Sequence, residues 1–82
     1  MDLIRQIKNI IEGMGELSKN DIQAINELLM HDEWGVALEH LCASIMEDKI
    51  NISNEQFIEI GNIGEAMEME GSLWEELKHL IR

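Results

Sequence analysis

The sequence predicts an all-α fold, a compact bundle of four to five short, mostly antiparallel helices. The chain has no proline, it is rich in leucine, isoleucine, methionine, glutamate and alanine, and its apolar residues recur at intervals of three and four. Its 82 residues suffice for one small core, and 45% of them are hydrophobic. We therefore expect residues 1–82 to form a single domain rather than a disordered acidic chain.

The first two helices are recognised by their apolar stripes and by their ends. The first is expected from residue 3 to about residue 12, because Gly13 and Gly15 then permit a turn and weaken any helix. The second begins after Ser18, since Asp21 follows three residues later in a variant of the capping box. The inward residues are Leu3, Ile7, Ile10, Ile11 and Met14 in the first helix and Ile22, Ile25 and Leu29 in the second.

A short corner at residues 31–33 precedes the third helix, which is expected to run to about Asp48. The carboxylates of Asp32 and Glu33 favour the positive end of this helix. Cys42 lies at the edge of its apolar stripe and is expected to be a buried structural thiol rather than a nucleophile. The stripe itself consists of Trp34, Leu38, Leu41 and Ile45.

Two further capping boxes organise the C-terminal part of the chain. Ser53 with Gln56 predicts a fourth helix from residue 54 to about residue 70, which Gly71 ends. Ser72 with Glu75 predicts another box, which opens a short final helix. In that helix the residues expected to face inward are Leu73, Leu77, Leu80 and Ile81, with Trp74 flanking them.

Charge is the strongest functional signal. The chain has 17 acidic and 6 basic residues, a formal charge of −11. This potential repels nucleic acid and anionic membranes and attracts basic surfaces, so we expect a basic protein partner and neither direct nucleic-acid nor membrane binding. An excess of acid that only keeps the domain soluble is the alternative. Every charged residue between Lys49 and Lys78 is acidic, namely Glu55, Glu59, Glu65, Glu68, Glu70, Glu75 and Glu76.

No catalytic, cofactor-binding or metal site is predicted. His31, His40 and His79 are far apart, and no pair has the i, i+4 spacing that lets two imidazoles reach one metal. The calcium-loop pattern is absent, and a bundle of this size has little room for a substrate pocket. Gly61 and Gly64 lie within a helical pattern, so they predict a close approach of another helix rather than a phosphate loop.

The cysteine usage and the N-terminal sequence favour the cytoplasm. One cysteine cannot form an internal disulfide, on which small secreted domains usually depend. The N-terminus lacks a basic region followed by an apolar run, and no apolar stretch reaches the length of about 18 residues that a membrane span needs. We therefore expect neither an export signal nor a membrane segment.

The fourth helix carries the predicted partner-binding surface. A turn of about 100° per residue places Phe57, Ile60, Gly64 and Met67 on its inner side. The opposite side combines carboxylates with two large apolar side chains, a combination typical of binding interfaces. The alternative is that these two apolar side chains pack under the connection at 50–52 or under the last helix. The residues of this predicted surface are Glu55, Ile58, Glu59, Asn62, Glu65 and Met69.

Two other segments are expected to contribute less. Asp32 and Glu33, at the start of the third helix, are predicted to assist the fourth helix in binding the partner. The outer side of the third helix repeats the mixed pattern in a weaker form, with Val36, Glu39, Ala43 and Glu47.

The segment His31-Asp32-Glu33-Trp34-Gly35-Val36-Ala37-Leu38-Glu39-His40-Leu41-Cys42 resembles the hallmark of the MafI-type immunity proteins. The shared frame is an acid and an aromatic residue before glycine, then Ala-Leu-Glu, Leu-Cys and an acidic helix end. Further agreement lies in Ile50-Asn51-Ile52-Ser53, in Met67-Glu68-Met69, and in Trp74 with Leu77. The resemblance covers residues 26–80.

That family, with the related CdiI proteins of contact-dependent inhibition systems, protects a bacterium from a toxin made by itself or by its neighbours. Several of the toxins are nucleases. The resemblance implies a cytoplasmic, non-enzymatic inhibitor of a cognate toxin's C-terminal domain, expected to be a basic nuclease such as an RNase. It transfers no catalytic residue and no toxin-contact signature to numbered positions here.

Two other functions remain open from the sequence. One is an acidic adaptor or regulatory module that binds a basic cellular protein. The other is a homodimer in which Ile58 and Met69 meet their own copies, although like charges on both faces oppose this pairing. A monomer is therefore expected when the chain is free.

Overall fold

The structure, a computed structural model, describes residues 2–82, and it confirms the all-α prediction. Four α-helices are followed by one short α-helix and a 3-10 helix. Within residues 2–82 no strand is formed, and only one isolated parallel bridge joins Ile52 to Ile81. The helices are α1 (Leu3–Glu12), α2 (Lys19–Met30), α3 (Trp34–Glu47), α4 (Asn54–Ala66) and α5 (Ser72–Glu75), and the 3-10 helix is Glu76–Leu80.

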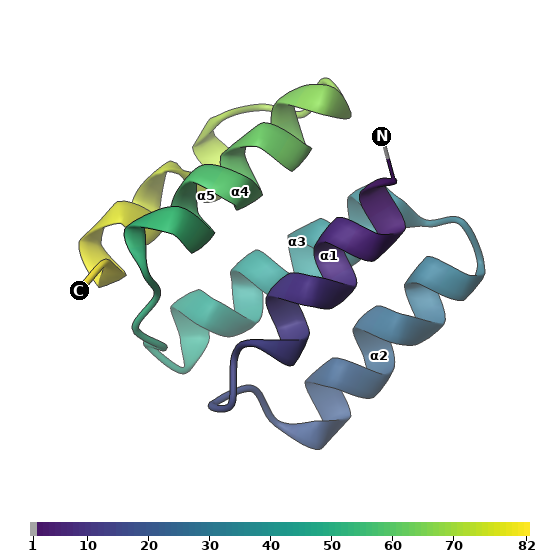
Figure 1. Cartoon of the computed structure of the whole chain (residues 1–82), viewed down its shortest axis with the longest axis horizontal. Helices are drawn as coiled ribbons and strands as arrows, with labels where there is room; N and C mark the ends of the chain where they lie inside the picture. The colour runs from purple at the N-terminus through teal and green to yellow at the C-terminus, as the bar shows by residue number, and fades with distance from the viewer. Residues whose placement is uncertain (1) are drawn as a thin grey trace.

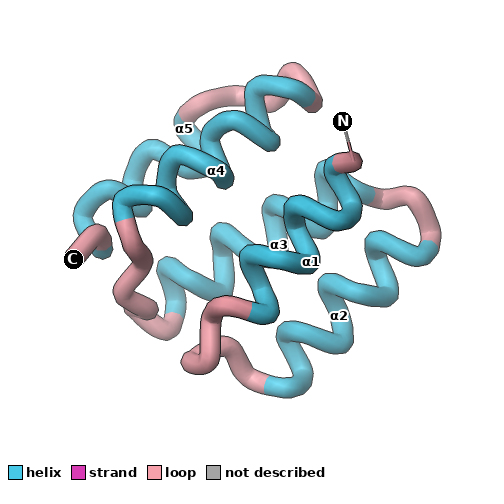
Figure 2. Tube along the Cα trace, viewed as in Figure 1, coloured by secondary structure: helices cyan, strands magenta, loops and turns pink. Residues whose placement is uncertain are grey.

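The helices pack in two layers, and α3 is the central helix because it contacts all the others. Helix α3 contacts α1, α2, α4, α5 and the 3-10 helix, and its most extensive contact is with α2. In Figure 1, α1 lies in front of α3, with α2 on one side and α4 and α5 on the other. The shortest dimension of the molecule is 18 Å, which matches two layers of helices about 10 Å thick. Figure 2 shows that the connections between these helices are short.

Side chains cap three helix starts. The predicted Ser53–Gln56 box is complete, with Gln56 N donating to Ser53 Oγ at 3.0 Å and Ser53 N donating to Gln56 Oε1 at 2.8 Å. Ser18 Oγ accepts from Asp21 N at 3.1 Å, as expected for α2. Helix α1 has a cap that the sequence analysis missed, since Arg5 N donates to Asp2 Oδ1 at 3.1 Å. These hydrogen bonds satisfy amides that have no partner within the helix.

The predicted Ser72–Glu75 box is wrong. Ser72 is the first residue of α5, Gly71 occupies the capping position, and no side chain caps this helix. The physical reason lies upstream, because α4 ends earlier than predicted, at Ala66 rather than near residue 70. The chain therefore enters α5 from a helical Gly71 with φ of −61°.

Helices α2, α3 and α4 end in the same hydrogen-bonded motif. Asp32, Lys49 and Glu68 have positive φ angles of 59°, 50° and 57°. After α4, Met69 N donates to Gly64 O at 2.9 Å and Glu68 N donates to Glu65 O at 3.0 Å. This is the Schellman arrangement, with a non-glycine residue in the left-handed position. The expected break at Gly13 and Gly15 ends α1, but no glycine has a positive φ.

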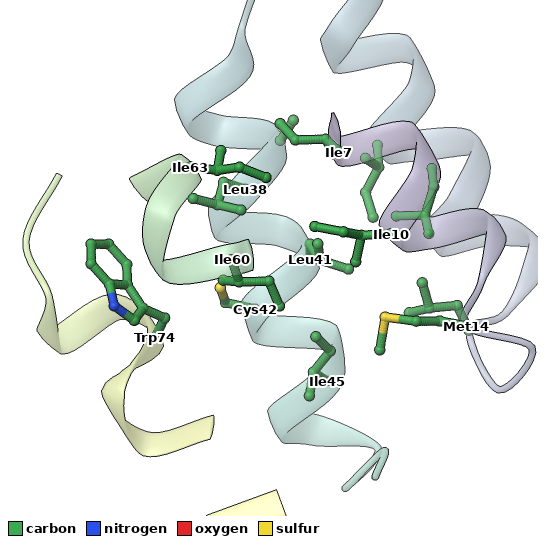
Figure 3. Close-up of a cluster of buried hydrophobic side chains, with 14 of the residues drawn as sticks. Ile7, Ile10, Met14, Leu38, Leu41, Cys42, Ile45, Ile60, Ile63 and Trp74 are labelled. Carbon is green, nitrogen blue, oxygen red and sulfur yellow. The ribbon is translucent and has the colours of Figure 1, made fainter. Parts of the chain in front are cut away.

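The core lies around α3, where α1, α2, α4, α5 and the 3-10 helix pack against it, and Figure 3 shows part of it. Trp74 is buried rather than flanking the core, which corrects the prediction for the last helix. Ile63 is also buried, although it was not placed on the predicted inner stripe of α4. The residues labelled in Figure 3 are Ile7, Ile10, Met14, Leu38, Leu41, Cys42, Ile45, Ile60, Ile63 and Trp74, and all are buried.

The glycines of α4 accommodate the Trp74 ring. A Cβ added to Gly64 would meet the six-membered part of the indole, 2.6 Å from Cη2, and one added to Gly61 would lie 3.1 Å from Nε1. The predicted close approach at these glycines is therefore confirmed, and the group that approaches is a side chain of the last helix.

The C-terminus is tied to the connection before α4. Ile52 N donates to Leu80 O at 3.0 Å, and Arg82 N donates to Ile52 O at 3.0 Å. These bonds, together with the Trp74 contact, hold α5 and the 3-10 helix on the inner side of α4. The other side of α4 is exposed.

Candidate interaction surfaces

The outer side of α4 is a continuous exposed surface, which we call the α4 face and define as Glu55, Ile58, Glu59, Asn62 and Glu65. All five residues are exposed. Ile58 is 50% exposed, so the alternative in which it packs under the connection at 50–52 or under the last helix is wrong. An isoleucine in this position contributes little to the core and is available to a partner.

A groove runs along one edge of the α4 face. It has a volume of about 550 Å³ and is lined by Gln6 of α1 and by Glu59, Asn62, Glu65 and Ala66 of α4. We call it the α1–α4 groove. The expectation that a bundle of this size has little room for such a pocket is therefore wrong. Gln6 was not among the predicted site residues. Its position could have been inferred from the helical period of α1, because Gln6 stands three residues after Leu3 and so lies at the edge of the buried side.

No basic side chain neutralises these carboxylates. Within residues 2–82 the one ion pair joins His40 of α3 to Asp21 of α2, with Nε2 and Oδ1 3.1 Å apart. The lysines and arginines of the described chain form no ion pair with an acid, so no cationic side chain of residues 2–82 compensates the carboxylates of the α4 face. Such a surface attracts cations from solution and accelerates the association of a basic partner.

Met69 is not part of the α4 face. Because α4 ends at Ala66, Met69 turns away from the helix axis, and its Sδ lies 3.8 Å from the position of a Cβ added to Gly35. It is partly buried against the core. Met69 instead helps to form a second groove of about 360 Å³ between α3 and α5, which we call the α3–α5 groove. Its lining residues are Glu39, Met69, Glu70, Ser72 and Leu73.

Asp32 and Glu33 also lie apart from the α4 face. Both are exposed at the turn between α2 and α3. Neither lines the α1–α4 groove or the α3–α5 groove. The structure therefore brings together five of the eight predicted partner-binding residues, and it places Met69, Asp32 and Glu33 elsewhere.

Two titratable groups, Cys42 and Asp21, have shifted pKa values. Burial raises the pKa of the Cys42 thiol to about 12, and the charge of Glu39 adds to this effect, so Cys42 is a neutral thiol at physiological pH. Hydrogen bonds from His40 and then from Ser18 lower the pKa of Asp21. Since Asp21 belongs to α2 and His40 to α3, their contact links the two helices at their surface.

Neither a metal cluster nor a membrane helix is found in residues 2–82. No three histidine, cysteine or acidic side chains come together as ligands for a metal ion. No helix in the same part of the chain has the length and apolarity needed to cross a bilayer.

Comparisons of the chain with protein-family models, with curated proteins and with solved structures returned no match.

Proposed function

We propose that the chain is an immunity-type inhibitor that binds the C-terminal domain of a cognate antibacterial toxin through the α4 face. The observation that carries this proposal is the exposed Ile58 among carboxylates that no lysine or arginine of residues 2–82 pairs with. An apolar anchor supplies affinity in such an interface, and the surrounding charges supply orientation and a fast encounter. The resemblance of residues 26–80 to MafI-type immunity proteins supports the same proposal.

The proposed target surface is the substrate cleft of a nuclease, expected to be an RNase. Such a cleft binds a phosphate backbone and is therefore basic. Glu55, Glu59 and Glu65 offer negative charges on one helix side, as the backbone does along one strand. The α1–α4 groove beside them can receive a long basic side chain, because Glu59 and Glu65 are among its lining residues. Inhibition then follows from occlusion of the cleft, without any reaction on this chain.

In this proposal the protein acts in the cytoplasm, as a monomer until it meets the toxin. The formal charge of −11 opposes the pairing of two copies, especially at low salt.

The first experiment is recovery of the partner. A tagged chain is expressed in its source bacterium and purified at low salt, and bound proteins are identified by mass spectrometry. We expect a basic C-terminal toxin domain, whose nuclease activity the purified chain then inhibits. Recovery of an unrelated housekeeping protein as the stable partner would instead support the adaptor function.

The second experiment locates the surface. Changing Glu55, Glu59 and Glu65 together to lysine should weaken toxin binding by at least about 100-fold, since several close charge pairs become repulsive. The matched control changes Glu12, Glu16 and Glu27, which are also exposed, so that the net charge is altered equally. Isothermal titration calorimetry measures both affinities. An equal loss in the two variants would show that overall charge, and not the α4 face, governs binding.

A further inference from the structure

The α3–α5 groove has an apolar interior between acidic borders. Met69 and Leu73 are partly buried and pack against the core, while Glu39 on α3 and Glu70 before α5 are exposed. Its volume of about 360 Å³ lies near the lower end of the range of about 300–1,000 Å³ in which pockets hold ligands. The groove is therefore large enough for one large side chain and its immediate neighbours.

The apolar part continues beyond the groove onto α3. Val36 stands one turn before Glu39 on the same side of the helix and is 49% exposed. Met69 itself is held in place by its backbone, because its N–H donates to Gly64 O at 2.9 Å. A methionine on a fixed backbone keeps a flexible, polarisable side chain that adapts to the shape of a bound group.

The charge around this groove has one sign. Residues 20–48, which include α3, and residues 50–77, which include α5, contain no lysine or arginine. Neither Glu39 nor Glu70 takes part in the one ion pair of residues 2–82. Complementarity therefore requires positive charge on the occupant, placed on both sides of an apolar group.

We propose that the α3–α5 groove is a second docking site, which binds a cationic peptide segment of a protein partner by taking one large apolar side chain between Met69 and Leu73. Lysines or arginines on either side of that side chain lie against Glu39 and Glu70. The site is separate from the α4 face, because the two surfaces share no residue, and it does not depend on the function proposed for the α4 face. The protein thereby offers two docking surfaces of the same charge but different shape.

A peptide pair tests this site without changing the protein. The probe is a short fluorescein-labelled peptide with two lysines on each side of a central leucine, and its partner has serine in place of the leucine. Fluorescence anisotropy against the full chain measures both affinities. We expect the leucine peptide to bind at least about tenfold more tightly, as the loss of an interface anchor commonly costs this much. Equal affinities would mean that charge alone attracts the peptide, which would overturn the proposal.

The position of the peptide is measured by NMR of the methionine and isoleucine methyl groups. The Met69 signal should shift on binding, while the signal of Met30, which is 77% exposed on α2, should not. A shift of Ile58 in place of Met69 would assign the peptide to the α4 face and contradict the proposal. A Met69 signal that moves on dilution of the protein alone would show that a second copy of this chain occupies the groove, which would also contradict it.

Charge reversal supplies a further readout. The variant Glu39→Lys/Glu70→Lys should bind the leucine peptide at least about tenfold more weakly than the control Glu12→Lys/Glu16→Lys, which has the same net charge. All four positions are exposed, so both variants should fold, as their circular dichroism shows. Reversal of Glu55, Glu59 and Glu65 should weaken peptide binding no more than its own control does. This result separates the two sites, since loss of the toxin interaction at the α4 face leaves the peptide interaction unaffected.

Discussion

Ile58 and Ile60 are the same residue type two positions apart on α4, yet Ile58 is 50% exposed and Ile60 is fully buried. The inner side of α4 is so closely packed that Gly64 cannot accept one further carbon atom. The outer side faces solvent and carries carboxylates that no lysine or arginine of residues 2–82 pairs with. The difference indicates that the inner side of α4 contributes to the stability of the fold, whereas the outer side contributes little and can be changed without unfolding it.

The largest expected effect is that of Ile60→Ala. Removal of this buried side chain should lower the free energy of unfolding by about 2–5 kcal/mol, through lost burial and the cavity left behind. The same change at Ile58 should stay within about 0.5 kcal/mol, because half of that side chain is already in water. Chemical denaturation followed by circular dichroism measures both values.

A loss of about 4 kcal/mol could unfold a domain of this size, whose total stability is of that order. The milder Ile60→Val, with an expected cost of about 0.5–1.5 kcal/mol, keeps the comparison measurable. Equal costs at Ile58 and Ile60 would contradict the two-sided description of α4.

The next effect is that of Gly64→Ala, which should destabilise the fold by about 3 kcal/mol. The added methyl group meets the Trp74 ring, and the cost of overpacking exceeds the gain of about 1 kcal/mol from alanine's helix propensity. The control is Gly15→Ala, because a Cβ at Gly15 has no neighbour within 4 Å and its φ is not positive. Thermal unfolding compares the two variants.

A double substitution tests the cause. Trp74→Phe removes the part of the indole that the methyl group would meet, so Gly64→Ala should cost less in that background, with a coupling of about 0.5–3 kcal/mol. Strict additivity of the two changes would rule out the ring contact as the reason for the glycine.

A smaller effect is expected for Asp21, an acid that contributes to the stability of the fold, and almost none for the acids of the α4 face. Asp21→Asn should lower stability by about 1 kcal/mol at neutral pH, because the carboxylate accepts hydrogen bonds from His40 and Ser18. Glu59→Gln on the α4 face should change stability by less than about 0.5 kcal/mol.

The Asp21 effect depends on pH. Since hydrogen bonds from His40 and Ser18 hold the folded pKa of Asp21 below its ordinary value, its contribution is fully present above the unfolded pKa and is lost as the pH falls through the folded pKa. The wild type and Asp21→Asn should therefore differ at pH 7, begin to converge below about pH 4, and become equal only once the pH is below the folded pKa. Urea denaturation at a series of pH values measures the difference, and a constant difference down to pH 2 would contradict this role.

The smallest effect is an increase in stability. Lys49→Gly should stabilise the fold by about 0.5–1 kcal/mol, because the left-handed φ of 50° costs a lysine more than the extra chain entropy costs a glycine. The control is Lys8→Gly in the exposed middle of α1, where glycine should cost about 1 kcal/mol. Differential scanning calorimetry gives both shifts, and a loss of stability at Lys49 would mean that its side chain contributes contacts that outweigh the strain.

Helix starts could be predicted because their signals are local. Ser18 and Ser53 lie within three residues of the amides that they satisfy, so the sequence contains both partners of each hydrogen bond. The failure at Ser72 has the opposite origin. Its spacing to Glu75 fits a capping box, but the path of the chain before it was decided by the end of α4.

Helix ends were harder to predict than helix starts, and the error at the end of α4 misplaced one residue of the candidate site. The left-handed residue after α4 is Glu68 rather than a glycine, so no residue type marked the end at Ala66. Extrapolating the helix to residue 70 put Met69 on the α4 face, whereas it contacts α3 near Gly35. Residues well inside the helix, such as Ile58 and Glu59, were placed correctly because the 3.6-residue period holds there.

The helical class, the starts of α2 and α4 and the surplus of negative charge could all be predicted from the sequence, since each depends on composition or on residues a few positions apart. Three features could not be predicted: Trp74 fills the space over Gly64, Gln6 joins α4 in one groove, and Met69 joins Glu39 and Leu73 in another. These features arise from contacts between segments far apart in the chain. Such contacts are selected by how all the helices pack at once, which no local pattern records.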